Sequence, residues 1–199
     1  KIILTTTLCL ILLPAVFFFV QDYGNLSGTH RLLASLFQAV TPRTAGFNTT
    51  DLSMLTGASK AMMILLMLIG GSPSSTAGGM KTTTFALLLL NVLATFQSRD
   101  DVTAFGRRID VGVIKNAATI AMMYFMLFFF GGITISVYEG LPLLTCLYEA
   151  ASAVGTVGLT LGITPELHII SRLILIALMY LGRVGGMTLI YAVFSRKNN

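Results

Sequence analysis

Long apolar stretches with few charged side chains are the feature of this sequence that most limits its fold. A membrane-spanning helix needs about 20 apolar residues, and four stretches provide this length: residues 2–20, 57–96, 111–137 and 168–194. Only 11% of the 199 residues are charged, whereas soluble domains carry about 25%. We therefore predict an all-α integral membrane protein, which crosses the lipid bilayer several times, and we exclude a soluble enzyme domain.

The remaining composition argues against catalysis, metal binding and nucleic-acid binding. Thirteen basic and eight acidic residues give a net charge of only +5, and the basic residues are scattered, so no nucleic acid partner is expected. The two cysteines and two histidines form no disulfide framework and no metal-ligand spacing. The apolar stretches hold no acidic residue at mid-depth, so we expect no enzymatic activity.

Two further apolar segments, residues 30–41 and 141–154, are too short to cross a bilayer. Runs of about 10–14 residues are more often re-entrant or buried helices. Each lies between two long stretches, so the order is span, short helix, span, and then the same order again. We predict one repeat in residues 1–96, a linker in residues 97–115 and a second repeat in residues 116–199.

The distribution of charge predicts the orientation of the chain. Basic residues gather in the linker and the C-terminal tail: Arg99, Arg107, Arg108, Lys115, Arg196 and Lys197. The connections inside each repeat are mainly acidic. Because cytoplasmic loops carry an excess of Lys and Arg, we expect the linker and the C-terminus in the cytoplasm. Both short helices then enter the membrane from outside, and the protein lies in the cell inner (plasma) membrane.

The two repeats can be aligned, and the first contains an insertion. A shift of 112 residues places Thr44 on Thr156 and Gly70 on Gly182, and the shift falls to 107 at the next shared glycines. The additional residues lie within residues 71–77, where glycine, serine and proline interrupt a helix. Irregular backbone at membrane depth is tolerated where it is buried in protein or lines a watery cavity. We therefore predict that this insertion faces a pore.

Each short helix is followed by a T-x-G motif. The predicted ion-binding residues are Thr44, Ala45, Gly46 and Phe47 in the first repeat, and Thr156, Val157, Gly158 and Leu159 in the second. In potassium channels, the carbonyl groups of such a segment replace the hydration shell of the ion. Glycine suits this role because carbonyls that point to one axis need dihedral angles that a Cβ opposes. The middle residues, Ala45 and Val157, are expected to pack behind this selectivity filter.

Four segments carry a resemblance to a known family: "TPRTAGFNT", "GGSPSSTAGGMKTTTF", "SAVGTVGLTLGITPEL" and "YLGRVGGMT". The chain resembles the C-terminal half of the ion-translocating subunit of the Ktr/Trk/HKT superfamily of potassium transporters, and it is most similar to the bacterial Ktr type. The resemblance implies four repeats around one pore, of which this chain would hold the third and fourth. It also implies a homodimer bound to a cytosolic ring of nucleotide-binding regulatory subunits.

The same resemblance implies a gate loop inside the membrane, below the filter. Its residues are Gly70, Gly71, Ser72, Pro73, Ser74, Ser75, Thr76, Ala77, Gly78 and Gly79. Arg183 lies about fifteen residues into the last stretch and is therefore near mid-membrane, where ionisable residues are functional by default. We expect Arg183 beside the gate loop, and the alternative is an ion pair with an acid outside this chain. Lys81 is expected to mark the cytoplasmic side of the loop, and Glu149 to bond backbone behind the filter.

These expectations combine into one function. We expect uptake of K⁺ through a carbonyl-lined filter that the intramembrane loop gates, with Na⁺ as the alternative transported ion and coupling to Na⁺ or H⁺ left open. The segment "GSPSSTAGGMKT" has some likeness to a phosphate-binding loop, but Met80 separates Gly79 from Lys81 and no soluble strand precedes it. The alternative function is a non-conducting membrane scaffold or sensor built on the same repeat. Because the chain begins at Lys1 inside an apolar run, we expect it to be part of a longer protein.

Overall fold

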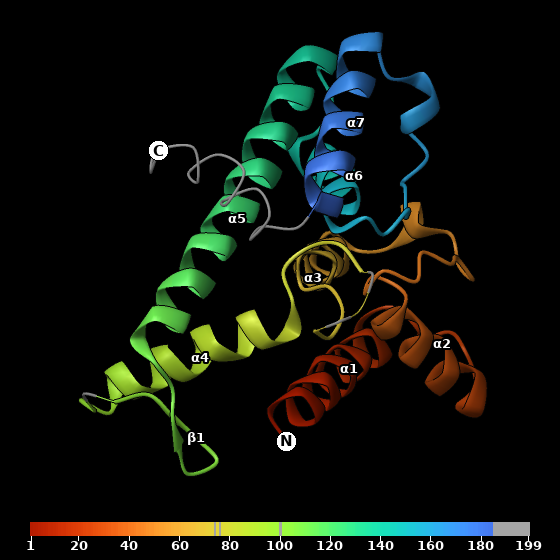
Figure 1. Ribbon diagram of the computed structural model, residues 1–199. Helices are drawn as coiled ribbons and strands as arrows, with labels where there is room; N and C mark the ends of the chain where they lie inside the picture. Colours follow the sequence, from red (N-terminus) through yellow and green to blue (C-terminus); the bar gives the residue numbers. More distant parts are fainter. Residues whose placement is uncertain (74, 76, 100, 185–199) are drawn as a thin grey trace, which may run out of the picture.

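The computed structural model describes residues 1–73, 75, 77–99 and 101–184 (Figure 1). The α-helices of this part are α1 (Ile2–Gln21), α2 (Gly28–Val40), α3 (Gly57–Leu68), α4 (Thr82–Phe96), α5 (Val111–Glu139), α6 (Leu143–Gly155) and α7 (Ile169–Val184). Short 3-10 turns at Leu52–Met54 and Thr164–Glu166 precede α3 and α7, and strands β1 (Thr103–Ala104) and β2 (Arg107–Arg108) form a hairpin between α4 and α5.

Helices α1 and α5 are long and apolar enough to cross a membrane, and the surface that they present is apolar. Their most hydrophobic windows have mean hydropathy values of 2.5 and 2.0, but only 17% and 28% of those windows are buried inside the protein. Leu13 is 71% exposed and Phe130 is 62% exposed. A core helix of a soluble protein would be mostly buried, so these exposed apolar faces fit contact with lipid.

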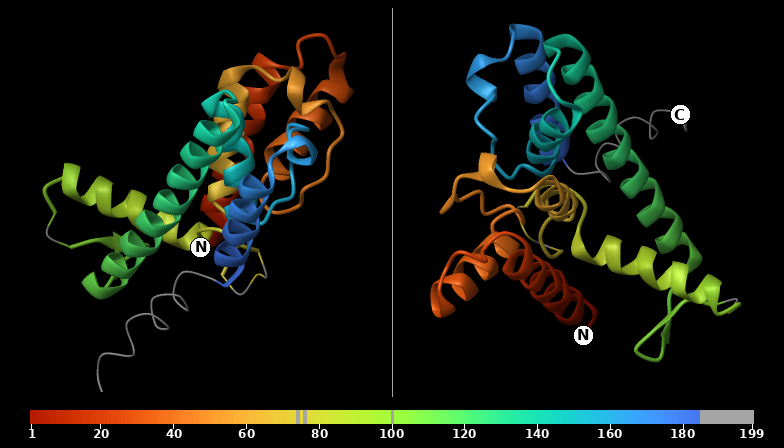
Figure 2. Two further views of the ribbon diagram at one scale, coloured as in Figure 1. Left: turned by 90° about the horizontal axis from the view of Figure 1, so that it is seen from above. Right: turned by 180° about the vertical axis from the view of Figure 1, so that it is seen from behind.

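The two short helices occupy the positions that the sequence predicts. Helix α2 begins two residues before the predicted segment 30–41 and ends one residue before its end. Helix α6 begins two residues after the start of the predicted segment 141–154 and ends one residue after its end. Each packs on the first span of its own repeat, α2 on α1 and α6 on α5. Helix α6 also packs on α3 and α7, and the right-hand view of Figure 2 shows it between α5 and α7.

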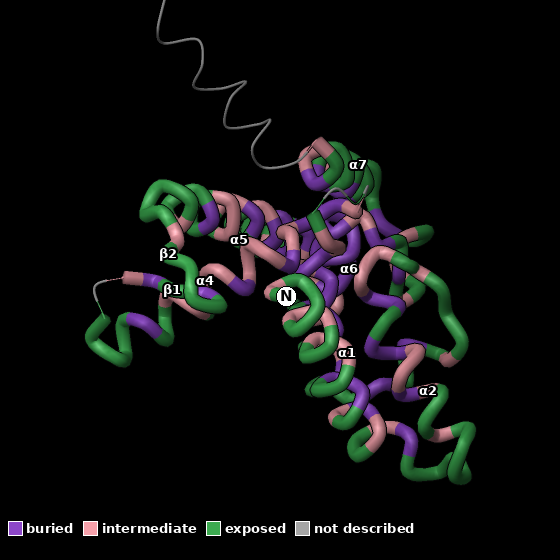
Figure 3. The backbone as a smooth tube through the Cα atoms, turned by 60° about the horizontal axis from the view of Figure 1, so that its bottom comes forward, coloured by how far each residue is buried: buried purple, intermediate pink, exposed green. Residues whose placement is uncertain are grey.

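The two short helices differ in burial (Figure 3). Every residue of α6 from Tyr148 to Gly155 is buried, whereas α2 buries only Ser35, Gln38 and Ala39. Close helix contacts explain the burial of α6. A Cβ at Gly155 would overlap the Met67 carbonyl oxygen of α3, and a Cβ at Gly182 of α7 would overlap the Val154 carbonyl oxygen of α6. The hydrophobic core of the chain is therefore built around α6.

The second apolar stretch is interrupted where the sequence predicts it. Helix α3 ends at Leu68 and α4 begins at Thr82, with irregular backbone between them. Helix α3 is seen almost end-on in Figure 1, whereas α4 lies across the view, so the chain changes direction at the interruption. Ile69 and Met80 form an isolated parallel bridge at the base of this segment.

The predicted linker differs in detail from the structure. Helix α5 begins at Val111, at the start of the predicted 111–137 stretch, and it therefore takes up residues 111–115 of the predicted 97–115 linker. The β1–β2 hairpin in the same linker was not predicted. In the fourth stretch, the described part of α7 ends at Val184, and the rest of the predicted span, to residue 194, lies outside the described residues.

An acidic residue at the end of each first span joins it to the start of the second span. Asp22 accepts hydrogen bonds from the Thr56 N–H and the Ser59 hydroxyl at the start of α3. Glu139 accepts from the His168 N–H (2.9 Å) just before α7 and pairs with His168 Nδ1 (2.8 Å). Carboxylates at helix N-termini satisfy free N–H groups and complement the helix dipole. The sequence analysis did not identify these caps.

Candidate functional site

The two T-x-G segments share one backbone feature, a positive φ at both the threonine and the glycine. Thr44 and Gly46 have φ values of 67° and 76°, and Thr156 and Gly158 have φ values of 52° and 90°. The middle residues do not have positive φ. A positive φ is uncommon for a residue with a side chain and unfavourable for β-branched threonine. Its occurrence at both threonines therefore shows that the two repeats build this segment in the same way.

The structure brings the two T-x-G segments together, although 112 residues separate them in the sequence. A Cβ at Gly46 would overlap the carbonyl oxygen of Val157, so the backbones are in direct contact. Glycine is therefore needed at position 46 for two reasons: the positive φ, and the close approach of the Val157 carbonyl oxygen. At position 158 only the positive φ favours glycine, because a Cβ there would meet no atom within 4 Å. The predicted ion-binding residues of both repeats therefore share one region.

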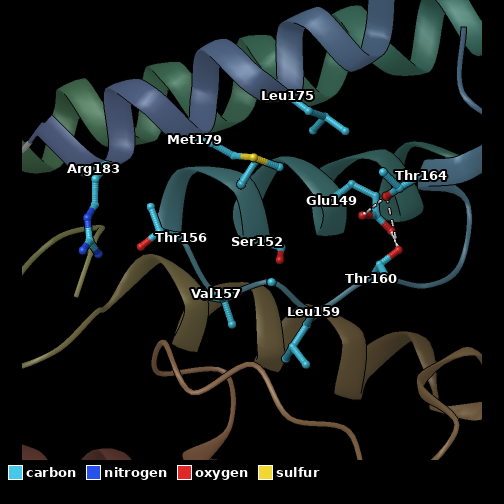
Figure 4. A pocket seen from close by; sticks show the side chains of 12 residues that line it. Glu149, Ser152, Thr156, Val157, Leu159, Thr160, Thr164, Leu175, Met179 and Arg183 are labelled. Carbon is cyan, nitrogen blue, oxygen red and sulfur yellow. Dashed lines mark hydrogen bonds between the residues drawn. The ribbon is translucent and has the colours of Figure 1, made fainter. Parts of the chain in front are cut away.

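The side chains of the two segments are packed differently. Val157 and Leu159 are buried, and in Figure 4 they point away from α7 toward α3. Ala45 is exposed in this chain and Phe47 is 70% exposed. The expectation that the middle residue packs behind the filter is therefore met by Val157 but not by Ala45. The helix arrangement differs, because α6 packs extensively on both α3 and α7, whereas α2 packs mainly on α1 and meets α3 at the Gln38–Met63 hydrogen bond.

Polar side chains hold the outer part of each segment. The Thr41 hydroxyl donates to the Phe47 carbonyl (2.6 Å). In the second repeat, Glu149 accepts from the Leu161 N–H (2.8 Å) and from the hydroxyls of Thr160 (2.8 Å) and Thr164 (2.9 Å). Glu149 is 4% exposed, and buried carboxylates need such donors. Glu149 was expected to bond backbone behind the filter; it does bond the Leu161 backbone N–H, together with two hydroxyl groups, and the filter itself stays a prediction.

The connection from the first segment to α3 lies outside the spans and carries its own acidic cap. Asp51 accepts hydrogen bonds from the hydroxyl and the N–H of Ser53. These two hydrogen bonds hold the pKa of Asp51 below its ordinary value, the hydroxyl having the larger effect. Lys60 donates to the Ser53 carbonyl (2.8 Å). The ionised Asp51 carboxylate and Lys60 therefore fix the conformation of the segment that precedes α3.

The gate loop, residues 70–79, is closed at its base by backbone hydrogen bonds. The Gly70 N–H donates to the Met80 carbonyl (2.8 Å), and the Met80 N–H donates to the Leu68 carbonyl (3.1 Å). The Thr82 N–H donates to the Gly71 carbonyl (3.2 Å). These bonds satisfy polar backbone groups that the interruption of the helix would otherwise leave unpaired. Ser74 and Thr76 of this loop lie outside the described residues.

The end of the gate loop touches the second T-x-G segment directly. The Gly78 N–H donates to the Thr156 Oγ1 atom (3.0 Å). A Cβ at Gly78 would overlap that hydroxyl oxygen, and Gly78 and Gly79 are both buried. Gly79 also has a positive φ of 70°. Glycine at position 78 therefore permits a contact between loop and filter segment that a larger residue would prevent.

Two basic residues lie beside this contact. Lys81 Nζ donates to the carbonyls of Ser75 (3.0 Å) and Ala77 (2.6 Å), so the lysine ties the loop to its own C-terminal end. The sequence analysis gave Lys81 only a positional role. Arg183 lies near the end of α7 and lines a cavity of about 510 Å³ that Thr156 and Glu149 also line. In Figure 4, Arg183 and Thr156 lie at one end of this cavity, and Glu149 lies at the other.

Fold and site together define a class of protein. It is an all-α membrane protein in which two short helices are each followed by a glycine-containing segment, and these segments meet in one region next to the irregular connection between α3 and α4. The chain belongs to the TrkH family of cation transport proteins, whose family model matches residues 2–198. This is a family of transporters and not of enzymes.

Comparison with individual proteins supports this assignment. The chain is 37% identical to the Ktr system potassium uptake protein B of Bacillus subtilis, over 96% of this chain and 44% of the relative. It is 36% identical to the potassium/sodium uptake protein NtpJ of Enterococcus hirae, over 100% of this chain and 46% of the relative. The crystal structure of the potassium transporter TrkH from Vibrio parahaemolyticus superimposes with a TM-score of 0.78 at 21% identity, covering 98% of this chain and 44% of that one. The chain thus spans slightly less than half the length of these proteins.

Proposed function

We propose that the protein containing this chain transports K⁺ across the cell membrane through a filter of backbone carbonyl groups. Residues 44–47 and 156–159 would form two strands of that filter. The observation that carries this proposal is the repeated conformation, with positive φ at both threonines and both glycines, in two segments that are in backbone contact. A scaffold or sensor would need neither the strained threonines nor the close approach at Gly46.

The two segments alone do not enclose a pore. The relatives are more than twice as long as the matched region, so the remaining half would supply two further strands. The printed names of the relatives include both potassium uptake and potassium/sodium uptake. We propose K⁺ as the transported ion and Na⁺ as the alternative, because all four strands together determine selectivity.

The gate loop would control passage below the filter. The Gly78–Thr156 hydrogen bond supports this role, as does the irregular backbone of the described loop residues. Lys81 would hold the loop in its closed shape by bonding two of its carbonyls. Arg183, in the wall of the same cavity as Thr156, would add positive charge that opposes a cation at this level.

Orientation and partners follow from the charge pattern and from the family. We propose a multi-pass protein of the inner (plasma) membrane, with the linker of residues 97–115 and the C-terminus in the cytoplasm. The relatives named as parts of a Ktr system fit a homodimer with cytosolic nucleotide-binding regulatory subunits. The linker hairpin, with Arg107 and Arg108 exposed, would lie on the side of the membrane where those subunits are found.

Substitution of the two filter glycines tests this proposal. In the full-length protein, Gly46→Ser and Gly158→Ser should each reduce the preference for K⁺ over Na⁺, because a Cβ at positive φ distorts the strand. Uptake of each cation would be measured in cells that lack other potassium uptake systems. Gly24→Ser is the matched control, since Gly24 is exposed and a Cβ there would meet no atom within 4 Å. Unchanged ion preference in both filter variants would contradict the proposal.

A further inference from the structure

The two filter threonines have the same backbone conformation but different hydroxyl partners. Thr44 and Thr156 both have positive φ and occupy equivalent positions in the two repeats. The Thr156 Oγ1 atom accepts a hydrogen bond from the Gly78 N–H of the gate loop (3.0 Å). The Thr44 hydroxyl makes no hydrogen bond with any of the described residues. The chain therefore joins its gate loop to one of its two filter threonines and not to the other.

The contact occupies one acceptor position of the Thr156 hydroxyl, which also lines the cavity of about 510 Å³. The Gly78 α-carbon lies so close that a Cβ on it would overlap the Thr156 Oγ1 atom and approach Cγ2 to 2.7 Å. The N–H group also directs the positive end of its dipole at the lone pairs that a cation would use. A hydroxyl oxygen at the end of a filter strand is a hard ligand suited to K⁺. A cation that approaches this oxygen from the side of Gly78 would therefore have to displace the loop.

We propose that Thr156 couples the filter to the gate loop, because its hydroxyl binds either the Gly78 N–H or the permeating cation. This inference rests on the proposed function and specifies how the same site is regulated. A cation that reaches the inner end of the filter displaces the loop, and an empty filter returns the hydroxyl to Gly78. Gate opening then depends on the ion itself, through Thr156 and not through Thr44.

The test follows the accessibility of the gate loop in the full-length protein. Ser75 is exposed, and Ser75→Cys is a nearly isosteric change that places a thiol on the loop, in a background carrying Cys9→Ala because native Cys9 is exposed. Reconstituted vesicles are treated with a water-soluble thiol reagent in K⁺ or in choline. We expect labelling to be faster in K⁺ by about fivefold, the effect of losing one ordinary hydrogen bond.

Variants at the two threonines separate coupling from ion binding. Thr156→Val removes the hydroxyl at nearly constant volume, so labelling should be fast in both K⁺ and choline, and Thr156→Ser should keep the dependence on K⁺. Thr44→Val is the matched control, which should alter K⁺ flux but keep the K⁺-dependent labelling. Gly78→Ala reaches the same contact from the loop side, and it should label fast in both media even if Thr156→Val fails to insert into the membrane.

Failure of the coupling and failure of the filter assignment give different results. If Thr156→Val and Gly78→Ala retain K⁺-dependent labelling to the same degree as Thr44→Val, the coupling is wrong and Thr156 is only a filter residue. If neither threonine variant changes flux or ion preference, the filter assignment of the proposed function is wrong instead.

Discussion

Glu149 provides the sharpest test of how the second filter segment is held. The carboxylate is 4% exposed and accepts three hydrogen bonds, from the Leu161 N–H and from the hydroxyls of Thr160 and Thr164. Glu149→Ala removes all three acceptor contacts at once. The loop that follows the filter would then lose its attachment to the pore helix.

The structure limits how much stability Glu149→Ala can lose. Hydrogen bonds to a charged group contribute about 1.5–3 kcal/mol each, but Thr160 is exposed and water can replace its contact with the carboxylate. Glu149 lines the cavity of about 510 Å³, so water can also fill the space left by its side chain. We therefore expect Glu149→Ala to lower the free energy of unfolding by about 2–4 kcal/mol, a value set mainly by the Leu161 and Thr164 contacts.

By the same reasoning, Glu149→Gln should lower the stability far less than Glu149→Ala. The amide oxygen can accept from the Leu161 N–H and the Thr160 hydroxyl, and the amide nitrogen can donate to the Thr164 hydroxyl, which rotates to accept. We expect a change in the free energy of unfolding within about 1 kcal/mol. The comparison separates the role of the three contacts from the role of the negative charge.

Both quantities can be measured on the full-length protein. Thermal unfolding of the purified protein in detergent gives the stability, and cation uptake gives the ratio of K⁺ to Na⁺ transport. Glu166→Ala is the matched control, because Glu166 is an exposed acid in the same outer connection. Equal stability and selectivity of Glu149→Ala and Glu166→Ala would refute the reasoning. Equal damage from Glu149→Gln and Glu149→Ala would show that charge, not hydrogen bonding, is what matters.

Three further predictions concern orientation, gating and packing. A cysteine at position 101, in the linker, should react with an impermeant thiol reagent only after permeabilisation, and labelling of intact cells would overturn the proposed orientation. Deletion of residues 71–77 should raise K⁺ flux and leave ion preference intact, so a deleted protein that inserts normally but conducts no faster would contradict the gate. Gly182→Ala should destabilise the protein by about 1–3 kcal/mol, because its Cβ would overlap the Val154 carbonyl oxygen; thermal unfolding at the parent's stability would show that α7 can shift at little cost.

The order of elements could be predicted because it depends on local properties of the chain. Apolar length separates α1 and α5 from the short α2 and α6, and the Gly, Ser and Pro content places the interruption before α4. The T-x-G motifs could be recognised because their strained conformation requires glycine at a fixed position. Each of these signals is contained within about twenty residues of sequence.

The contacts that organise the site could not be predicted, because they join distant parts of the chain. The Gly78–Thr156 hydrogen bond links residues 78 positions apart, and the Asp22–Ser59 contact links residues 37 positions apart. A signal for the acidic caps was present, since the repeat alignment places Ser59 on Ser171 and each first span ends near an acid, Asp22 or Glu139. The alignment alone does not show that these acids reach the next span.

In the proposed four-repeat pore, the difference between α2 and α6 predicts which faces of this chain the other half would cover. Helix α6 is covered by the second span of the preceding repeat, α3, in addition to its own partners α5 and α7. In the same arrangement, α2 would be covered by a second span from a repeat that precedes this chain. Leu32 and Leu33 of α2 are 51% and 59% exposed, and Ile176 of α7 is 59% exposed. We therefore expect these two faces to contact the remaining half, with α7 covering a further pore helix as α3 covers α6. The exposure of Ala45 would then have the same origin as the exposure of α2, and the proposed first filter segment would acquire its supporting wall from that half.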